Sequence, residues 1–174
     1  MAEDNTDVLI ADASVLLRMK HLGVLDALVQ FRKALSLHFF VTEAVLHEVE
    51  LEIRQEELAQ RGVDVIQQSF SVIAKMKELR DLHVISKRLS DADAEMFVIS
   101  LENKCMLWTD DNRLLETSHK NGVRAIRLFN PFCRLVESGI LLPNYVYSLG
   151  SRLCEFDERF TVKNLAELKI RLGL

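Results

Sequence analysis

The stretch "LWTDDNRLL", residues 107–115, holds the end of one element and the start of the next. Leu107 and Trp108 are typical of the end of a buried strand, and the residues from Asn112 onward are typical of a helix. Between them stand Asp110 and Asp111, two adjacent carboxylates whose charges repel each other. Such a pair indicates either helix caps or half of a metal site.

Strand-like and helix-like segments alternate along the rest of the chain. Short apolar runs predict strands at 7–12, 37–42, 104–109 and 123–131. Helical periodicity predicts helices from Ser14 to about Ala34, from Glu43 to a break at Gly62, and over 69–80, 90–103 and 112–122. Helices between strands predict a parallel sheet covered on both faces. We therefore expect a three-layer α/β/α sandwich around a central, mostly parallel sheet of 4–5 strands.

The domain organisation follows from length and pattern. A chain of 174 residues suits one domain with a sizeable core. We predict a domain over residues 1–130, with a helical insertion at about 50–80. Residues 131–174 have a helical pattern and are predicted to form a C-terminal extension packed on the same domain.

Composition limits the class of protein. The chain is 49% hydrophobic and 28% charged, which favours a globular protein. No apolar run approaches the roughly 18 residues of a membrane span, and "MAEDNTD" (1–7) is acidic where a secretion signal is basic. The three cysteines are widely spaced, as free thiols of a reducing cytoplasm would be. We expect a cytoplasmic protein without membrane contact, and a net charge of −4 argues against a large basic surface.

Carboxylates gather where the predicted strands end. Asp12 ends the first strand, and Asp110 and Asp111 follow the third. Glu48 lies near the start of the helix after the second strand, and Asp93 lies in the first turn of the helix that precedes the third. Ligands of open α/β sheets bind outside the carboxyl ends of the strands. We therefore expect four separate segments to bring carboxylates to one rim.

Each of these acids also has a purely structural interpretation. Ser90 and Asp93 fit a capping box, Asp111 fits an N-cap, and Asp12 can cap in the same way. Glu48 fits an ordinary solvated residue. As a set, however, the acids are expected to have no Lys or Arg beside them to neutralise their charge. Clustered oxygen ligands of this kind favour a Mg²⁺ or Mn²⁺ site.

The set resembles the PIN-domain nucleases, in particular the toxin ribonucleases of bacterial toxin–antitoxin systems. The resemblance runs from Val8 to about Asn130 and is carried by "VLIADASVLL" (8–17), "VTEAVLHEV" (41–49), "RLSDADAEMFVIS" (88–100) and "LWTDDNRLL" (107–115). It implies that four catalytic acids hold one or two Mg²⁺ or Mn²⁺ ions, namely Asp12, Glu48, Asp93 and Asp111. It also implies hydrolysis of phosphodiester bonds in single-stranded RNA and, for toxins, a small antitoxin partner.

Some positions stay open at this point. Rival acids lie close to two of the four: Glu52 beside Glu48, and Asp91 and Glu95 beside Asp93. Asp110 is either a cap or a further metal ligand next to Asp111.

The chemistry can also be argued from charge. A phosphodiester is negative, so an attacking hydroxide is repelled until cations intervene, and metal ions lower the pKa of bound water. A helix N-terminus behind Asp111 adds positive potential at the same place. Ser14, Thr109 and Arg113 are predicted as weaker substrate contacts, although Thr109 equally fits a structural hydroxyl.

Other functions and partners remain as alternatives. A catalytically silent, PIN-like interaction or scaffold module is the main rival to a nuclease, and DNA is an alternative substrate. A phosphoacceptor receiver domain is disfavoured, because "IADAS" (10–14) offers one acid where that class needs a pair. The apolar positions of 135–153 exceed what one short helix can bury, which predicts a homodimer.

Overall fold

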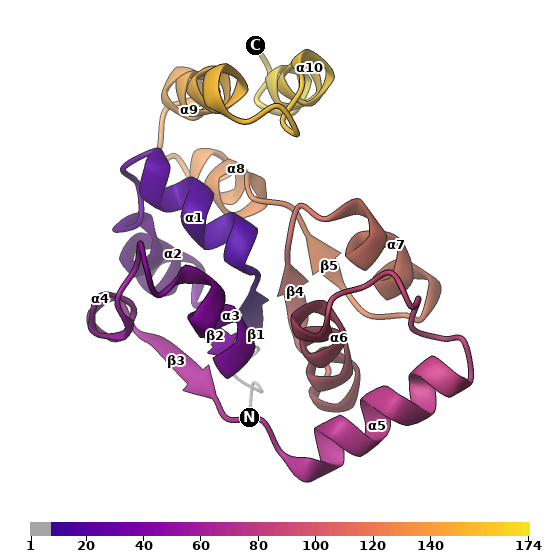
Figure 1. Cartoon of the computed structure of the whole chain (residues 1–174). Coiled ribbons are helices and arrows are strands. Elements are labelled where there is room, and N and C mark those ends of the chain that lie inside the picture. Colours follow the sequence, from indigo (N-terminus) through magenta and orange to yellow (C-terminus); the bar gives the residue numbers. More distant parts are fainter. Residues whose placement is uncertain (1–7) are drawn as a thin grey trace, which may run out of the picture.

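The structure of the chain, a computed structural model shown in Figure 1, describes residues 8–174. Within these residues, five parallel strands form one sheet in the order β3-β2-β1-β4-β5. They are β1 (Val8–Ala11), β2 (His38–Thr42), β3 (Val63–Ile66), β4 (Met106–Trp108) and β5 (Ala125–Ile126). The predicted α/β sandwich is confirmed, with a sheet that is wholly parallel. The acidic stretch 1–7 lies outside the described residues.

Helices connect the strands and flank the sheet (Figure 1). They are α1 (Ala13–His21), α2 (Ala27–Leu35), α3 (Glu43–Val49), α4 (Gln55–Gln60), α5 (Phe70–Asp81), α6 (Asp91–Asn103), α7 (Asn112–Lys120), α8 (Asn130–Glu137), α9 (Pro143–Phe156) and α10 (Val162–Arg171). Because helices cover the sheet, its inner strands are near-continuous apolar runs rather than alternating ones. Within residues 8–174, no helix combines the length and the apolarity needed to cross a membrane.

The segment 50–80 differs from the predicted helical insertion, because it contains strand β3. The helix expected from Glu43 ends at Val49, and Gly62, with a φ of +74°, turns the chain from α4 into β3. β3 is an edge strand that pairs with β2, with Val63 opposite Phe39. Four residues at a sheet edge are too few for an alternating pattern to stand out, so no strand was predicted between the break at Gly62 and the helix over 69–80.

Two other elements have bounds that differ from those predicted. The single helix predicted from Ser14 to Ala34 is two helices, α1 and α2, separated by a turn in which Gly23 has a φ of +71°. The strand predicted over 123–131 is only Ala125–Ile126, and Pro131 lies in the first turn of α8 instead of stopping a strand. Proline suits a first helical turn because its missing N–H has no intrahelical partner there.

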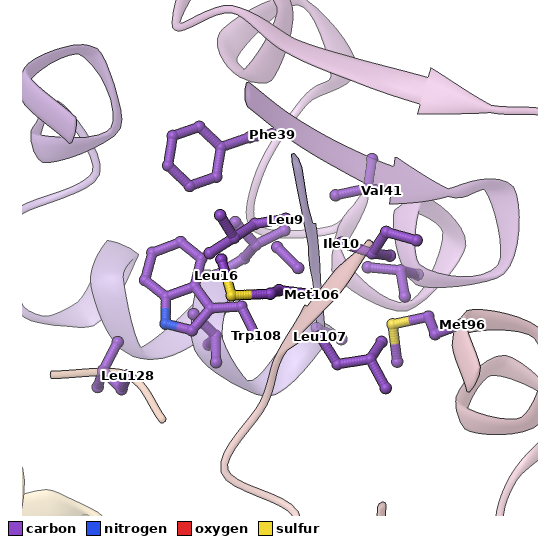
Figure 2. Close-up of a cluster of buried hydrophobic side chains, with 14 of the residues drawn as sticks. Leu9, Ile10, Leu16, Phe39, Val41, Met96, Met106, Leu107, Trp108 and Leu128 are labelled. Carbon is purple, nitrogen blue, oxygen red and sulfur yellow. The ribbon is translucent and has the colours of Figure 1, made fainter. Parts of the chain in front are cut away.

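The core is built around the middle strands of the sheet. Figure 2 shows Leu9 and Ile10 of β1 lying close to Leu107 and Trp108 of β4, with the Phe39 ring beside the Trp108 indole. The ring centroids of Phe39 and Trp108 are 5.6 Å apart. These side chains are fully buried, so β1 and β4 are fixed relative to each other by packing on both faces.

The C-terminal helices join the same core. Val146, Leu149 and Leu153 of α9 and Leu168 of α10 are buried members of the hydrophobic cluster that includes the strands. α10 packs closely on α9, since a Cβ atom at Gly150 would lie 2.7 Å from Cδ2 of Leu168. The division of the chain at residue 130 stays a prediction, because the core itself is continuous across it.

Candidate active site

A cavity of about 1040 Å³ opens at the carboxyl ends of β1 and β4. Strand register places the two ends level, with Ala11 opposite Trp108, and the Asp12 N–H continues the ladder by donating to the Trp108 carbonyl at 3.0 Å. All five acids predicted as metal ligands line this cavity, namely Asp12, Glu48, Asp93, Asp110 and Asp111. The structure thus brings together residues from four separate segments, as expected for this edge of a parallel sheet.

Asp12 is held from two sides through one of its oxygens. Its Oδ2 accepts hydrogen bonds from Oγ of Ser14 at 2.6 Å and from Oγ1 of Thr109 at 2.8 Å. The Thr109 hydroxyl in turn accepts the N–H of Asp111 at 3.0 Å. Thr109 is fully buried, so its hydroxyl positions the two aspartates relative to each other. This arrangement favours a structural role for the Thr109 hydroxyl over direct contact with a substrate.

Asp93 and Asp111 each take part in capping the N-terminus of a helix, α6 and α7 respectively. Asp111 Oδ1 accepts the N–H of Leu114 at 2.8 Å, and Asp93 Oδ2 accepts the N–H of Ser90 at 3.2 Å in a reciprocal capping box. Within residues 8–174, no hydrogen bond is found to the other oxygen of Asp12, Asp93 or Asp111. Each of the three carboxylates therefore has one oxygen fixed by the fold and one available for a ligand.

The electrostatics of the site show that the acids face one another. Burial raises the pKa of Asp93, and the charges of Asp12 and Asp111 raise it further, against hydrogen bonds from Ser90 that lower it. Burial also raises the pKa of Glu48, with further contributions from the charges of Asp12 and Asp93. Like charges this close disfavour ionisation, so a cation among them would be bound favourably.

The rivals of the predicted acids lie elsewhere. Glu52 contacts Nε2 of His21 through Oε2 at 2.6 Å and does not line the cavity. Asp91 pairs with Arg80 at 2.8 Å, and Glu95 is buried without lining the cavity. Among these alternatives, the geometry is consistent with Glu48 and Asp93.

Asp110 differs from the other acids because both of its oxygens are engaged. Oδ2 pairs with the Arg18 guanidinium, and Oδ1 accepts the N–H of Leu128 at 3.1 Å. The same guanidinium binds Asp157 at 2.6 Å, and Arg18 is only 5% exposed. The expectation that no cation lies beside the acids is therefore wrong for Asp110, and its geometry suits a structural role better than metal binding.

The sequence contained one signal for Arg18. It lies on the stripe of α1 that also carries Val15 and Leu22, three residues before it and four after it, and both are buried. A charged residue in such a stripe requires a buried partner. The partners are 92 and 139 residues away in sequence, so the pattern gave no means of naming them.

Several cations also line the cavity. Arg113, predicted as a substrate contact, lines it near the start of α7, and so does Arg127, whose Nη2 donates to Oδ1 of Asn112 at 2.7 Å. Arg159, Lys163 and Arg171 contribute from the C-terminal segment. These last three were not predicted, because an exposed charged residue has no sequence pattern that indicates what it faces.

The side chains of the cavity can be compared with the ligands that a divalent metal ion prefers. The acids that line the cavity offer carboxylate oxygens, which suit Mg²⁺ or Mn²⁺. Within the part of the chain that the structure describes, no three acids, histidines or cysteines are already placed around one point where an ion could sit. Mg²⁺ is commonly held by one or two carboxylates together with waters and substrate phosphates. The residues present fit an open site of that kind.

The chain is thus an α/β protein with a parallel sheet, and its acid-lined cavity lies at the carboxyl ends of the strands, where ligands of such sheets usually bind. A family model described as PIN domain (DUF3368) matches residues 8–149, and the chain belongs to this PIN-domain family, as predicted. Among solved structures it is similar to a PilT N-terminus domain protein, SSO1118, from the hyperthermophilic archaeon Sulfolobus solfataricus P2. The two sequences are 16% identical, and the match covers 71% of this chain and 89% of the other with a TM-score of 0.50. At this level of identity the similarity is one of fold. No curated protein matches the chain.

Proposed function

We propose that this protein is a nuclease that hydrolyses phosphodiester bonds of single-stranded RNA with Mg²⁺ or Mn²⁺. PIN domains are generally nucleases, which supports the class of reaction. The observation that carries the proposal is the division of roles within Asp12, Asp93 and Asp111. One oxygen of each accepts hydrogen bonds that fix its position, and the other has no hydrogen bond within residues 8–174.

These carboxylates and Glu48 would hold the metal. When bound, the ion would supply a lowered pKa for the attacking water and charge stabilisation for the phosphate. The Thr109 hydroxyl and the Ser14 hydroxyl keep Asp12 oriented, which removes the need to reorganise the site on binding. The N-terminus of α7 lies directly behind Asp111 and favours a phosphate oxygen in front of it.

Arg113 is the residue that we assign to the substrate in this part of the site. It lines the cavity beside Asp111, and within residues 8–174 it has no ion pair. A guanidinium in this place can bind two phosphate oxygens at once. It would hold the scissile phosphate against the carboxylates, which otherwise repel it.

Two further parts of the proposal concern partners. The resemblance to toxin-type PIN ribonucleases supports a small antitoxin protein as a partner and a cytoplasmic location. Exposed apolar side chains at the start of α9, among them Leu142 at 75% and Tyr145 at 45%, support a homodimer.

A scaffold module without activity is the second candidate. The observation in its favour is that, across residues 8–174, no three potential ligands are yet gathered around one point. Such a protein would bind no metal at this edge. Its acids would serve only as caps and as partners of Arg18.

The test pairs metal binding with cleavage. Mn²⁺ is expected to raise the melting temperature of the wild type by adding binding free energy to folding, and to support cleavage of a mixed single-stranded RNA pool. Asp12→Asn should lose both effects. Asp91→Asn is the matched control, because Asp91 begins the same helix as Asp93 but pairs with Arg80 outside the cavity.

The outcomes separate the two candidates. A wild type that shows neither Mn²⁺ stabilisation nor cleavage would leave the scaffold module in place of the nuclease. Cleavage of single-stranded DNA but not of RNA, measured in parallel, would keep the reaction and change the substrate.

A further inference from the structure

We propose that the C-terminal helices form the phosphate-binding wall of the active cavity, holding the backbone of a single nucleic-acid strand several nucleotides long. The wall consists of Arg159, Lys163 and Arg171. The inference rests on the proposed function, because it assigns a substrate-binding surface to the same site.

The first support is position. The three cations lie at and after the junction of α9 and α10, yet they line the same cavity as the acids at the sheet edge. The family match ends at residue 149, so the wall lies beyond the matched region. Figure 1 shows α9 and α10 lying together at one end of the molecule, beyond α1 and α8. The wall is therefore a feature of this chain in addition to its family's acidic edge.

The second support is the lack of neutralising partners. Within residues 8–174, Lys163 has no hydrogen bond or ion pair, and Arg171 donates only to the neutral amide of Asn130, at 2.9 Å. Arg159 has a side chain that is 74% exposed and a long contact of 3.4 Å with Asp157. Glu167 lines the cavity on the same helix, but no ion pair joins it to these cations. Two of the three cations of the wall, Lys163 and Arg171, thus have no ion pair within residues 8–174, and the third, Arg159, has only the long contact with Asp157.

The third support is the separation of charge within the cavity. Acids come from the ends of β1 and β4 and from α3 and α6, whereas the wall comes from the C-terminal segment. A phosphodiester strand needs both surfaces, since its scissile phosphate requires metal ligands and its neighbouring phosphates require cations.

Dimensions favour a strand over a single phosphate. Lys163 and Arg171 are separated by eight positions on α10, about 12 Å along its axis. A stacked strand advances about 3.4 Å per nucleotide, so this distance corresponds to about three or four nucleotides. The cavity of about 1040 Å³ is as large as the largest usual small-ligand sites.

Two contacts fix the position of the wall relative to the acids. The Arg18 guanidinium joins Asp157, which ends α9, to Asp110, which neighbours Asp111. Leu168 of α10 packs on Gly150 of α9, and its side chain also lines the cavity. A buried ion pair and a close helix contact thus hold the cations at a set place opposite the metal ligands.

Binding of a labelled oligouridylate of twelve nucleotides, measured by fluorescence anisotropy in EDTA, tests the wall without requiring activity. The double variant Lys163→Gln/Arg171→Gln is expected to bind at least tenfold more weakly at low salt. The slope of log K against log salt should fall by about 1.4, since each phosphate contact to a single strand contributes about 0.7. Lys169→Gln is the matched control, because Lys169 is exposed on the same helix and does not line the cavity. It should bind like the wild type.

Two further measurements, one with oligonucleotides of different length and one with a small phosphodiester, distinguish a failure of the wall from a failure of the proposed function. Wild-type affinity should rise from a dinucleotide to the twelve-nucleotide strand, and a flat dependence would overturn the wall. Equal binding by the double variant and the wild type, or equal loss in Lys169→Gln, would also overturn it. Hydrolysis of bis(p-nitrophenyl) phosphate by the wild type with Mn²⁺ tests the proposed function separately. If that hydrolysis fails while the double variant still loses strand binding, the wall stands and the nuclease does not.

Discussion

Three carboxylates at this site use one oxygen each to stabilise the fold and keep the other without a hydrogen bond within residues 8–174. Asp111 caps α7 with Oδ1, Asp93 completes a capping box with Oδ2, and Asp12 accepts two hydroxyl hydrogen bonds with Oδ2. The caps were predictable, because capping depends on residues three apart in sequence. The Thr109 hydroxyl that joins Asp12 to Asp111 was not, since it acts across 97 residues. Capping and metal binding are therefore compatible uses of one side chain.

Asp93→Asn tests this division at the residue scale. The pKa of Asp93 is raised by burial and by neighbouring acids, so its ionised form costs the metal-free fold stability. A raised pKa gives stability below the unfolded value of about 3.8 that is lost as pH rises through the folded value. Asn still accepts the Ser90 N–H. In EDTA the variant should melt at or above the wild type at pH 7, with the difference vanishing toward pH 4.

Thermal melting across this pH range checks the sign. A purely structural carboxylate at a helix start predicts the reverse, a loss of about 0.5–1 kcal/mol at pH 7. With Mn²⁺ added, the order should invert, because only the wild type retains the full ligand set.

Among the elements, those marked by a cap or by a buried apolar run were predictable, whereas of the two edge strands β3 was not predicted and β5 is shorter than the strand predicted over 123–131. Helices α6 and α7 were placed by caps and periodicity, and strands β1, β2 and β4 by buried apolar runs. β3 and β5 have four and two residues, and pairing with a neighbour stabilises them more than local preference does. The site acids followed from the strand ends, whereas the C-terminal cations depend on tertiary packing that no local pattern encodes.

The ion pair between Arg18 of α1 and Asp157, which follows α9, is the basis of the prediction for the elements. Burial raises the pKa of Asp157, but hydrogen bonds from Arg18 and from the Arg159 backbone outweigh it, and the pKa is lowered overall. A lowered pKa gives stability above the unfolded value that is lost as pH falls through the folded value. Asp157→Asn should therefore cost about 2 kcal/mol at pH 7, because it weakens a hydrogen bond to a buried charge.

Urea unfolding at several pH values measures this loss, which should shrink as the pH falls below about 4 and through the lowered folded pKa. Glu158→Gln serves as the control, since Glu158 is the exposed neighbour and has no ion pair within residues 8–174. A constant deficit at every pH would show that Asp157 acts through packing and not through charge.

The surface of the whole molecule combines the cavity with a separate apolar region. Val146, Leu149 and Leu153 of α9 are buried within the chain, so part of the apolar side chains in 135–153 already pack against the protein's own core. Ile140 and Leu142, just before α9, remain 49% and 75% exposed. Exposed apolar side chains that lie close together are typical of interaction surfaces.

A homodimer through this region is the prediction for the whole molecule. Light scattering at micromolar concentration should give twice the chain mass for the wild type, and Leu142→Glu should give one chain mass. The substitution places a charge in an interface that excludes water, while in the free chain Leu142 is already exposed, so folding should change little. Leu82→Glu, at a position that is 64% exposed after α5, is the matched control and should stay dimeric. A monomeric wild type across this concentration range would contradict the prediction, and a dimer that survives Leu142→Glu would place the interface elsewhere.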